Sequence, residues 1–318
     1  MNFWKKIKKP IMCSAPMSGI TDIAFRHMLS EYAKPDVIFT EFVSCDGLVS
    51  EGKEKLLSQL QFEKREKPIV AQLFGSKPEN FYFSAKLCQK LGFDGIDINM
   101  GCPDKDVIKQ NAGASLILQP ELARKIIKAT KEGSRKLPIS VKTRIGYSQP
   151  EVEKWIKFLL EQKPAVITLH GRTKQQKYKG EVNWKEIKKA KALIKKSSSQ
   201  TLLIGNGDIQ SLKEADEKAK RYDLDGIMIG RALLNDPLLF NEKKSIHDLS
   251  IRERKSLLIE HVEVFNKKLS QRNFSDLKKF YSTYLSNFKG AKELRIKLMK
   301  ADSPKELKNI LKTNKIEL

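Results

Sequence analysis

Eight short runs rich in Val and Ile recur along this chain of 318 residues, and helical spacing separates them. The runs begin at Ile11, Val37, Pro68, Gly95, Ile139, Val166, Leu202 and Gly226. Near-continuous apolar strands that alternate with helices are typical of a parallel sheet covered by helices. Eight such units over about 240 residues match a (β/α)₈ barrel, the TIM barrel. We therefore predict an α/β fold with this barrel over residues 1–244; a doubly wound open sheet is the alternative.

The pattern changes after about residue 245, where helical spacing continues without a strand candidate. Residues 245–318 contain 17 Lys and Arg against 9 Asp and Glu, so this segment is basic. Its apolar positions recur as expected for helices that bury one face in a small core. These positions are Leu257, Leu258, Val262, Phe265, Leu277, Phe280, Tyr281 and Leu285. We predict a small, basic, all-helical C-terminal domain over residues 245–318.

The whole chain is strongly basic, with a formal net charge of +23. Such an excess favours polyanions, of which nucleic acid and an anionic membrane are the obvious ones. A Lys-rich proteome is the other explanation, since lysine far outnumbers arginine here. No stretch approaches the roughly 20 apolar residues of a membrane span, and Pro10 and Pro16 interrupt the N-terminus too early for a signal peptide. We expect a cytoplasmic protein without a membrane partner.

The chain has four cysteines, at positions 13, 45, 88 and 102, and no pair has the C-x-x-C spacing of a zinc site. The four histidines are scattered along the sequence, so no metal site is expected. A chain with a large core does not need disulfides, and the thiols therefore indicate a reducing compartment. We expect Cys13, Cys45 and Cys88 to lie in or near the core.

Polar and charged side chains close almost every predicted strand at its carboxyl end. In a barrel these ends converge on one mouth, where active sites lie. The residues there are Glu41, Gln72, Asn99 to Cys102, Lys142, Arg144, His170 to Arg172, Asn206 to Asp208, Gly230 and Arg231. Gly205, Gly207 and Gly230 end the last two strands, where backbone N–H groups bind phosphate in such barrels. Tight-turn glycines are the alternative, and the full G-x-G-x-x-G of a dinucleotide site is missing.

Six motifs, in their order and spacing, resemble the tRNA-dihydrouridine synthase family. They are APMSGITDIAFR from residue 15, DINMGCP from 97, VKTRIGY from 141, LHGRT from 169, GNGDI from 205 and IGRALL from 229. The likeness covers essentially the whole chain, because SNFKGAKELRIKLMKADSPKEL in the basic tail is similar to that family's helical RNA-binding domain. The resemblance implies an FMN-dependent reduction of uridine to dihydrouridine in tRNA, mostly in the D-loop. It also implies NADPH as the reductant, with NADH as the alternative. We expect a monomer.

The resemblance assigns roles to individual residues. It makes Cys102 the catalytic proton donor and Asn99 a contact of the substrate base, with Arg144 and Arg172 as contacts of the flipped nucleotide or its backbone. The residues implied to surround FMN are Pro16, Met17, Ser18, Gln72, Lys142, His170, Asn206, Gly207, Asp208, Gly230 and Arg231. Candidate RNA contacts in the tail, for which a solvated helix face is the alternative, are Lys278, Lys279, Lys289, Lys292, Arg295 and Lys297.

The chemistry of these residue types agrees with the implied reaction. Reduction of the C5=C6 bond of uracil needs a hydride at C6 and a proton at C5. A free thiol with a pKa of about 8.5 is mostly protonated at neutral pH, so Cys102 can give up that proton; a buried structural cysteine is the alternative. A cation at Lys142 would stabilise the charge of a reduced flavin. His170 and Arg231 suit the phosphate, although His170 could equally orient the isoalloxazine.

Some interpretations stay open. The carboxylate of Glu41 either helps to read the base or pairs with Arg144. A flavin barrel oxidoreductase acting on a small molecule such as dihydroorotate would share the phosphate glycines and Lys142, but it would not explain the basic tail. An RNA-binding protein without catalysis would keep the charge, but it would have no need of Cys102.

Overall fold

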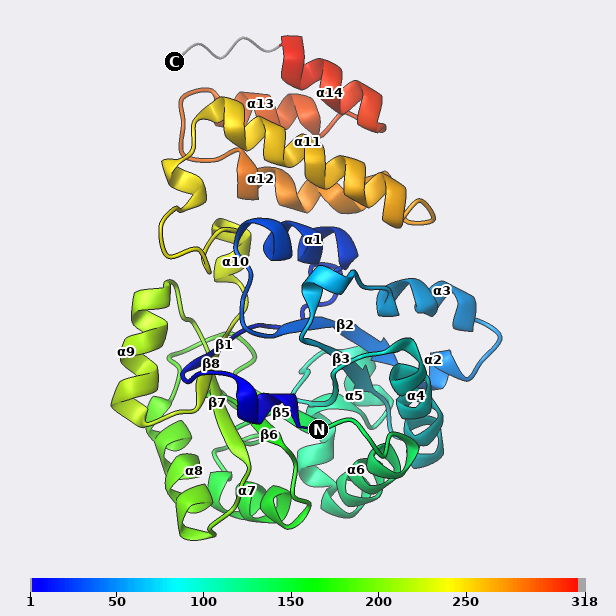
Figure 1. The fold of residues 1–318 in the computed structure, drawn as a ribbon, viewed down its shortest axis with the longest axis vertical. Coiled ribbons are helices and arrows are strands. Elements are labelled where there is room, and N and C mark those ends of the chain that lie inside the picture. The colour runs from blue at the N-terminus through cyan, green and yellow to red at the C-terminus, as the bar shows by residue number, and fades with distance from the viewer. Residues whose placement is uncertain (1, 314–318) are drawn as a thin grey trace.

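The computed structural model describes residues 2–313, and its centre is one sheet of eight parallel strands (Figure 1). The strands are β1 Ile11–Ser14, β2 Ile38–Ser44, β3 Ile69–Phe74, β4 Gly95–Met100, β5 Ile139–Arg144, β6 Val166–His170, β7 Leu202–Asn206 and β8 Gly226–Ile229. Their order is β1-β8-β7-β6-β5-β4-β3-β2, and a parallel bridge between Cys13 and Val37 joins β1 to the chain just before β2. The sheet therefore closes into the predicted (β/α)₈ barrel, and the open-sheet alternative is wrong.

Helices surround the barrel on its outside (Figure 1). They are α1 Ile23–Tyr32, α2 Cys45–Leu48, α3 Lys53–Leu57, α4 Pro78–Leu91, α5 Lys105–Lys109, α6 Pro120–Gly133, α7 Val152–Glu161, α8 Trp184–Lys196, α9 Leu212–Tyr222 and α10 Ala232–Asn235. Short 3₁₀ turns lie at η1 Phe3–Lys6, η2 Ser58–Leu60, η3 Lys64–Glu66 and η4 Gly113–Leu118. Helix α7 shows why these segments are helical: Val152, Trp155, Ile156 and Leu159 are buried at three- and four-residue spacing.

The chain after residue 245 is helical, as predicted. Its elements are η5 Ile246–Asp248, α11 Ile251–Lys268, η6 Phe274–Phe280, α12 Tyr281–Tyr284, α13 Ala291–Leu298 and α14 Pro304–Thr313. All eight apolar positions predicted for its core are buried. None of residues 245–313 forms a strand. Residues 314–318 of the predicted domain fall outside the described part of the chain.

The helical region packs on α1, above the barrel (Figure 1). The ring of Phe25 in α1 stacks on the ring of Phe280 with 5.2 Å between centroids, and both side chains are fully buried. Their contacts belong to one hydrophobic cluster that runs from the barrel helices into α11 and α13. The two parts thus share a continuous core, and a domain boundary at residue 245 stays a prediction.

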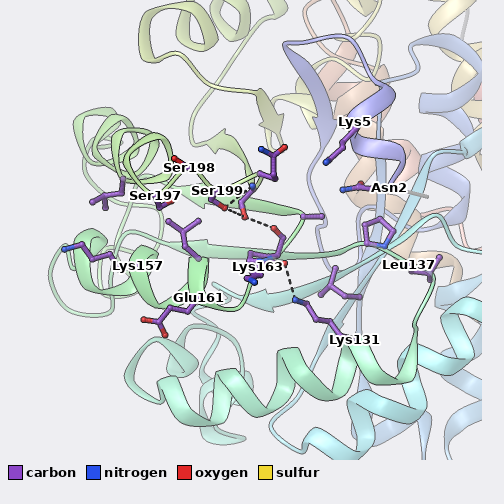
Figure 2. Close-up of a pocket in the computed structure, with 18 of the residues that line it drawn as sticks. Asn2, Lys5, Lys131, Leu137, Lys157, Glu161, Lys163, Ser197, Ser198 and Ser199 are labelled. Atoms are coloured by element: carbon purple, nitrogen blue, oxygen red, sulfur yellow. Dashed lines mark hydrogen bonds between the residues drawn. The ribbon is translucent and has the colours of Figure 1, made fainter.

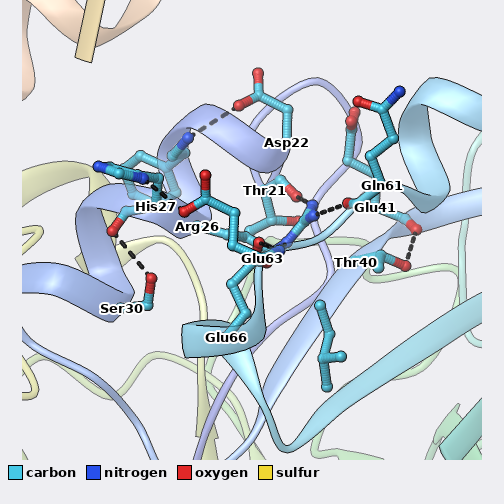
Figure 3. Close-up of polar contacts among 12 residues, drawn as sticks. Thr21, Asp22, Arg26, His27, Ser30, Thr40, Glu41, Gln61, Glu63 and Glu66 are labelled. Carbon is cyan, nitrogen blue, oxygen red and sulfur yellow. Dashed lines mark hydrogen bonds and ion pairs between the residues drawn. The ribbon is translucent and has the colours of Figure 1, made fainter. Parts of the chain in front are cut away.

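A buried ion pair fixes the loop between β1 and α1 (Figure 3). The Nε of Arg26 donates to Glu66 Oε2 at 2.6 Å, and both side chains are almost fully buried. The two terminal nitrogens of Arg26 donate to the carbonyls of Thr21 at 2.7 Å and Gln61 at 2.6 Å. Because Thr21 belongs to the β1–α1 loop and Gln61 and Glu66 to the segment before β3, Arg26 ties these two segments together.

The helical region reaches the same loop through Arg272. Its guanidinium donates to Glu41 Oε2 at 2.7 Å and lies 3.6 Å from Asp22 Oδ2. The other carboxylate oxygen of Glu41 accepts from the backbone N–H of Gly19 at 2.6 Å. Glu41 therefore pairs with Arg272. It does not pair with Arg144, which the sequence analysis considered as a partner and which bonds to backbone carbonyls instead. Burial and the nearby Glu41 raise the pKa of Asp22 to about 6.

The raised pKa of Asp22 predicts how Asp22→Asn changes stability. A folded-state pKa of about 6, above the unfolded value, means that ionised Asp22 destabilises the fold. The stability contributed by protonated Asp22 is present below pH about 4 and lost as pH rises through about 6. Asn keeps the bonds that Oδ1 accepts from Ala24 N and Phe25 N.

We therefore expect Asp22→Asn to have little effect at pH 4 and to raise the free energy of unfolding by up to about 3 kcal/mol at pH 7.5. Denaturant titrations of both proteins at several pH values measure this difference. A less stable variant at pH 7.5 would show that attraction between ionised Asp22 and Arg272 dominates instead.

Candidate functional site

A cavity of about 700 Å³ opens at the carboxyl ends of the strands, where barrels of this kind carry their active sites. It brings together most of the residues singled out from the sequence. All eleven residues implied to bind FMN line it: Pro16, Met17, Ser18, Gln72, Lys142, His170, Asn206, Gly207, Asp208, Gly230 and Arg231. Cys102, Asn99 and Arg144 line it as well.

A larger groove of about 1140 Å³ lies at the opposite end of the barrel, against the starts of β5 to β7 (Figure 2). Several lysines line it, and one of them, Lys131, serves the end of a helix. Lys131 Nζ donates to the carbonyls of Gln162 at 2.5 Å and Lys163 at 3.2 Å, just after α7 ends. Cations at helix C-termini neutralise the helix dipole. The position of Lys131 is thus explained by the fold, and this end of the barrel is the one associated with stability.

The loop after β4 holds Cys102 at the cavity. The side-chain oxygen of Asn99 accepts from the backbone N–H groups of Gly101 at 3.1 Å and Cys102 at 2.9 Å. The carbonyl of Cys102 accepts from Ala114 N at 3.0 Å. A Cβ on Gly113 would stand 2.8 Å from that carbonyl, so only glycine permits this approach. Burial raises the pKa of the half-buried Cys102 thiol, which therefore stays protonated at neutral pH.

A chain of buried hydrogen bonds orients Asn99. Its Nδ2 donates to Gln72 Oε1 at 3.0 Å, and Gln72 Nε2 donates to Asp97 Oδ2 at 2.7 Å. Ser140 Oγ donates to the other oxygen of Asp97 at 2.6 Å. Burial raises the pKa of Asp97 to about 6. The side-chain oxygen of Asn99 is thus bonded to the Cys102 loop, and its side-chain nitrogen is bonded to Gln72. The contact with the substrate base that the resemblance implies would be made in addition to these bonds.

The centre of the cavity is electropositive. Lys142 Nζ donates to Asn206 Oδ1 at 3.1 Å. Burial, with the nearby Arg144, lowers the pKa of Lys142 to about 8, so the amine still carries most of its charge at pH 7. Burial and the surrounding cations, Arg144 first among them, hold the pKa of His170 well below its usual range. His170 is therefore a neutral imidazole beside a charged lysine, an arrangement that favours an anionic ligand.

Arg144 joins two loops of the site. Its Nε donates to the carbonyl of Gly101 at 2.7 Å, immediately before Cys102. Its Nη1 donates to the carbonyls of Thr173 at 2.9 Å and Lys177 at 2.8 Å in the loop after β6. The side chain is almost fully buried. Arg144 lines the cavity, but these bonds make it first a brace between the Cys102 loop and the β6–α8 loop.

Asp208, just after the end of β7, forms ion pairs with two arginines. Both Arg172 and Arg231 form ion pairs with its carboxylate, and these pairs, Arg172 first, hold the pKa of Asp208 below its usual range. Arg231 is half exposed and lines the cavity. Arg172 is buried behind Asp208, donates to the carbonyl of Gly180 at 3.0 Å, and is not part of the lining. A direct contact of Arg172 with a nucleotide therefore stays a prediction.

The strand-end glycines differ in what they do. Gly207 and Gly230 line the cavity, and Gly207 has a φ of +140°, which favours glycine. Gly205 faces outward instead: a Cβ there would stand 2.7 Å from Leu224 and 2.9 Å from the ring of Trp184. Gly205 is not part of the cavity lining, so its role in a phosphate pocket stays a prediction; its lack of a side chain lets Leu224 and Trp184 pack on β7.

The basic residues of the tail fall into two groups. Lys278 lies 3.2 Å from Asp302 and donates to the carbonyl of Met299 at 2.8 Å, and Arg295 donates to the carbonyl of Leu285. These two side chains hold the helical region together. The exposed side chains are Lys279, Lys289, Lys292 and Lys297. Lys279 also lies against the β1–α1 loop of the barrel: a Cβ added to Gly19 would stand 3.3 Å from its Nζ.

Sequence reasoning missed one conspicuous lining residue, Tyr178, on the β6–α8 loop. The signal in the sequence was a single aromatic residue in the segment after a strand end, with a lysine on each side and a glycine two residues later. Cys13, Cys45 and Cys88 are fully buried, as predicted. Among residues 2–313, no helix is long and apolar enough to cross a membrane. The same residues contain no group of three or more His, Cys, Asp or Glu side chains that could bind a metal ion.

The chain is similar to proteins of one family along nearly its whole length. The family model described as dihydrouridine synthase matches residues 13–317. A probable tRNA-dihydrouridine synthase of Staphylococcus aureus (strain MRSA252) is 40% identical over 98% of this chain and 94% of its own. A probable tRNA-dihydrouridine synthase 2 of Bacillus subtilis (strain 168) is 38% identical over 98% of this chain and 95% of its own.

Solved structures share the architecture at low identity. TcOYE with pHBA superposes with a TM-score of 0.52 at 11% identity, covering 72% of this chain and 87% of that one. The old yellow enzyme from Trypanosoma cruzi gives a TM-score of 0.50 at 13% identity, covering 75% of this chain and 88% of that one. At such identities the likeness concerns the fold alone.

The burial of Cys102 predicts its reactivity. It is the one cysteine of the four that is not fully buried, so iodoacetamide should label it first. Because burial raises its pKa, the labelling rate at pH 7.5 should be lower than that of a small free thiol, and its rise with pH should have a midpoint above that of the free thiol. Mass spectrometry of timed reactions measures both, with Cys102→Ala as the unlabelled control. A midpoint below pH 8.5 would contradict the assigned environment.

Proposed function

The chain belongs to the dihydrouridine synthase family, and on that basis we propose that it reduces uridine to dihydrouridine in tRNA with FMN as cofactor. The observation that carries the proposal is the placement of a protonated thiol, Cys102, in one cavity with the charged amine of Lys142. A proton donor and a fixed cation are the two groups that this reduction asks of the protein. The small-molecule and non-catalytic interpretations lack comparable support.

The residues of the cavity fit FMN. Most of the charged side chains that line the cavity are cationic, among them Lys142 near its centre and Arg231 at its edge. Gly207 and Gly230 leave the backbone accessible at the ends of β7 and β8, where barrels bind phosphate. Met17 and Pro16 add apolar surface for a flat ring system. The β1–α1 loop that carries both is held by Arg26 and Glu41, so this wall of the site is formed in advance.

Bound FMN in its reduced form would supply the hydride for C6 of the uracil ring. Cys102 would donate the proton to C5, and its raised pKa keeps that proton on the sulfur until the carbon takes it. Lys142 would stabilise negative charge on the flavin, which its pKa of about 8 permits at neutral pH. Neutral His170 would accept or donate a hydrogen bond without adding to the charge.

The RNA substrate has to bring a base out of its stack to reach the cavity, which costs a few kcal/mol and least in an irregular loop such as the D-loop. Phosphate contacts would supply the compensating attraction. The exposed lysines of the helical region, Lys279, Lys289, Lys292 and Lys297, are the candidates for these contacts. We also propose NADPH as the reductant, a monomer as the active form and the cytoplasm as its location.

Cys102→Ala tests the proposal directly. The variant should bind flavin as the wild type does, because no cofactor contact is assigned to the thiol, and it should form at least 100-fold less dihydrouridine, the size of a typical general-acid contribution. Purified protein, NADPH and unmodified tRNA, with dihydrouridine measured by mass spectrometry, give the readout. Asp106→Ala, at an exposed residue of α5, is the control. Unchanged dihydrouridine formation in Cys102→Ala would refute the role of the thiol.

Charge reversal in the helical region tests the RNA surface. Lys289→Glu with Lys292→Glu should weaken tRNA binding and lower the slope of log K against log salt by about one per lost contact. Lys185→Glu with Lys188→Glu on α8, at the far side of the barrel, makes the same charge change elsewhere (Figure 1). Fluorescence anisotropy at several salt concentrations compares the two. Equal losses in both pairs would mean that only total charge matters.

A further inference from the structure

Tyr178 stands at the mouth of the cavity with much of its ring exposed. It lines the cavity, yet 56% of its surface remains accessible to solvent. The cofactor residues and Cys102 are on the strand ends, whereas Tyr178 is on the β6–α8 loop, between residues 171 and 183. Because this exposed ring also lines the cavity, a ligand that enters the cavity would pass it.

The backbone on both sides of Tyr178 is fixed. Arg144 donates to the carbonyl of Lys177 at 2.8 Å, the residue immediately before it. Arg172 donates to the carbonyl of Gly180 at 3.0 Å, two residues after it. Earlier in the loop, the N–H of Gln175 donates to the carbonyl of Tyr147 at 3.0 Å. The backbone that carries the ring is thus braced, so little backbone entropy remains to be lost when a ligand packs on the ring.

Two guanidinium groups lie within cation–π distance of the ring. The Cζ of Arg231 lies 5.1 Å from its centroid and that of Arg144 lies 5.8 Å away. Cations near an aromatic face hold the ring in place, and the exposed Arg231 can also meet a phosphate. An aromatic beside basic side chains is the combination with which proteins bind unstacked nucleotides.

We propose that Tyr178 is the platform on which a base flanking the reduced uridine stacks. The inference rests on the proposed function, because it needs an RNA with a base drawn out of its stack. When one uridine enters the cavity, its neighbours lose a stacking partner, and the exposed ring at the mouth replaces it. The ring lies at the mouth, so a flanking base reaches it and the target base passes further in. Arg144 then acts as a positioning residue for both the Cys102 loop and this platform.

The test uses flavin-loaded protein and three variants: Tyr178→Ala, Tyr178→Phe and Tyr82→Ala. Tyr82 is a matched control, since it is a partly exposed tyrosine on α4. Tyr178→Ala should weaken tRNA binding about ten- to a hundredfold, the usual effect of losing one base-stacking ring. Tyr178→Phe, which keeps the ring, and Tyr82→Ala should stay within about twofold of the wild type. Fluorescence anisotropy measures the binding, and steady-state rates give KM for tRNA.

A second readout separates stacking from charge. Stacking releases no counterions, so Tyr178→Ala should keep the wild-type slope of log K against log salt. Flavin content and flavin reduction by NADPH without tRNA should also be unchanged. Wild-type tRNA binding by Tyr178→Ala would overturn the proposal, and so would loss of flavin or an altered KM for NADPH. Failure of the wild type to reduce tRNA would instead refute the proposed function, so the two failures are distinguishable.

Discussion

The closure of the sheet between β1 and β2 is the constraint on which the site depends. The chain before β2 pairs with β1 through the bridge between Cys13 and Val37, and Ser14 N donates to the carbonyl of Val37 at 3.1 Å. In a closed parallel barrel every strand ends at the same mouth. Cys102 after β4, Lys142 in β5 and Arg231 after β8 are therefore brought around one cavity, although they are far apart in sequence.

Burial gives these groups the protonation states that the proposed chemistry needs. The thiol of Cys102 is kept protonated, and the pKa of Lys142 falls to about 8 without losing the charge at neutral pH. Hydrogen bonds to backbone groups do the positioning: Asn99 holds the N–H of Cys102, and Arg144 holds the carbonyl before it. Cys102, the proposed proton donor, is thus positioned by partners on β4 and β5, which belong to the rigid part of the fold.

The helical region is tied to the wall of the cavity by charge as well as by packing. Arg272 reaches Glu41, and Glu41 holds the N–H of Gly19, next to the lining residue Ser18. Phe25 and Phe280 form the apolar part of the same contact. Arg26 fixes the loop from its other end through a buried pair with Glu66. RNA bound on the helical region would therefore lie on an element in direct contact with the β1–α1 loop, which lines the cavity.

The sequence by itself determined the eight strands, the helical tail with its core positions, the buried cysteines and the set of polar strand ends. These follow from the period of apolar residues, which is a local property. Only the tertiary structure decided which donor meets which acceptor. Glu41 bonds to Arg272, 231 residues away, Gly205 packs against helices, and the ring of Tyr178 is carried on a loop braced by Arg144. Such pairings depend on how distant segments of the chain pack together, and the periodicity of the sequence does not predict them.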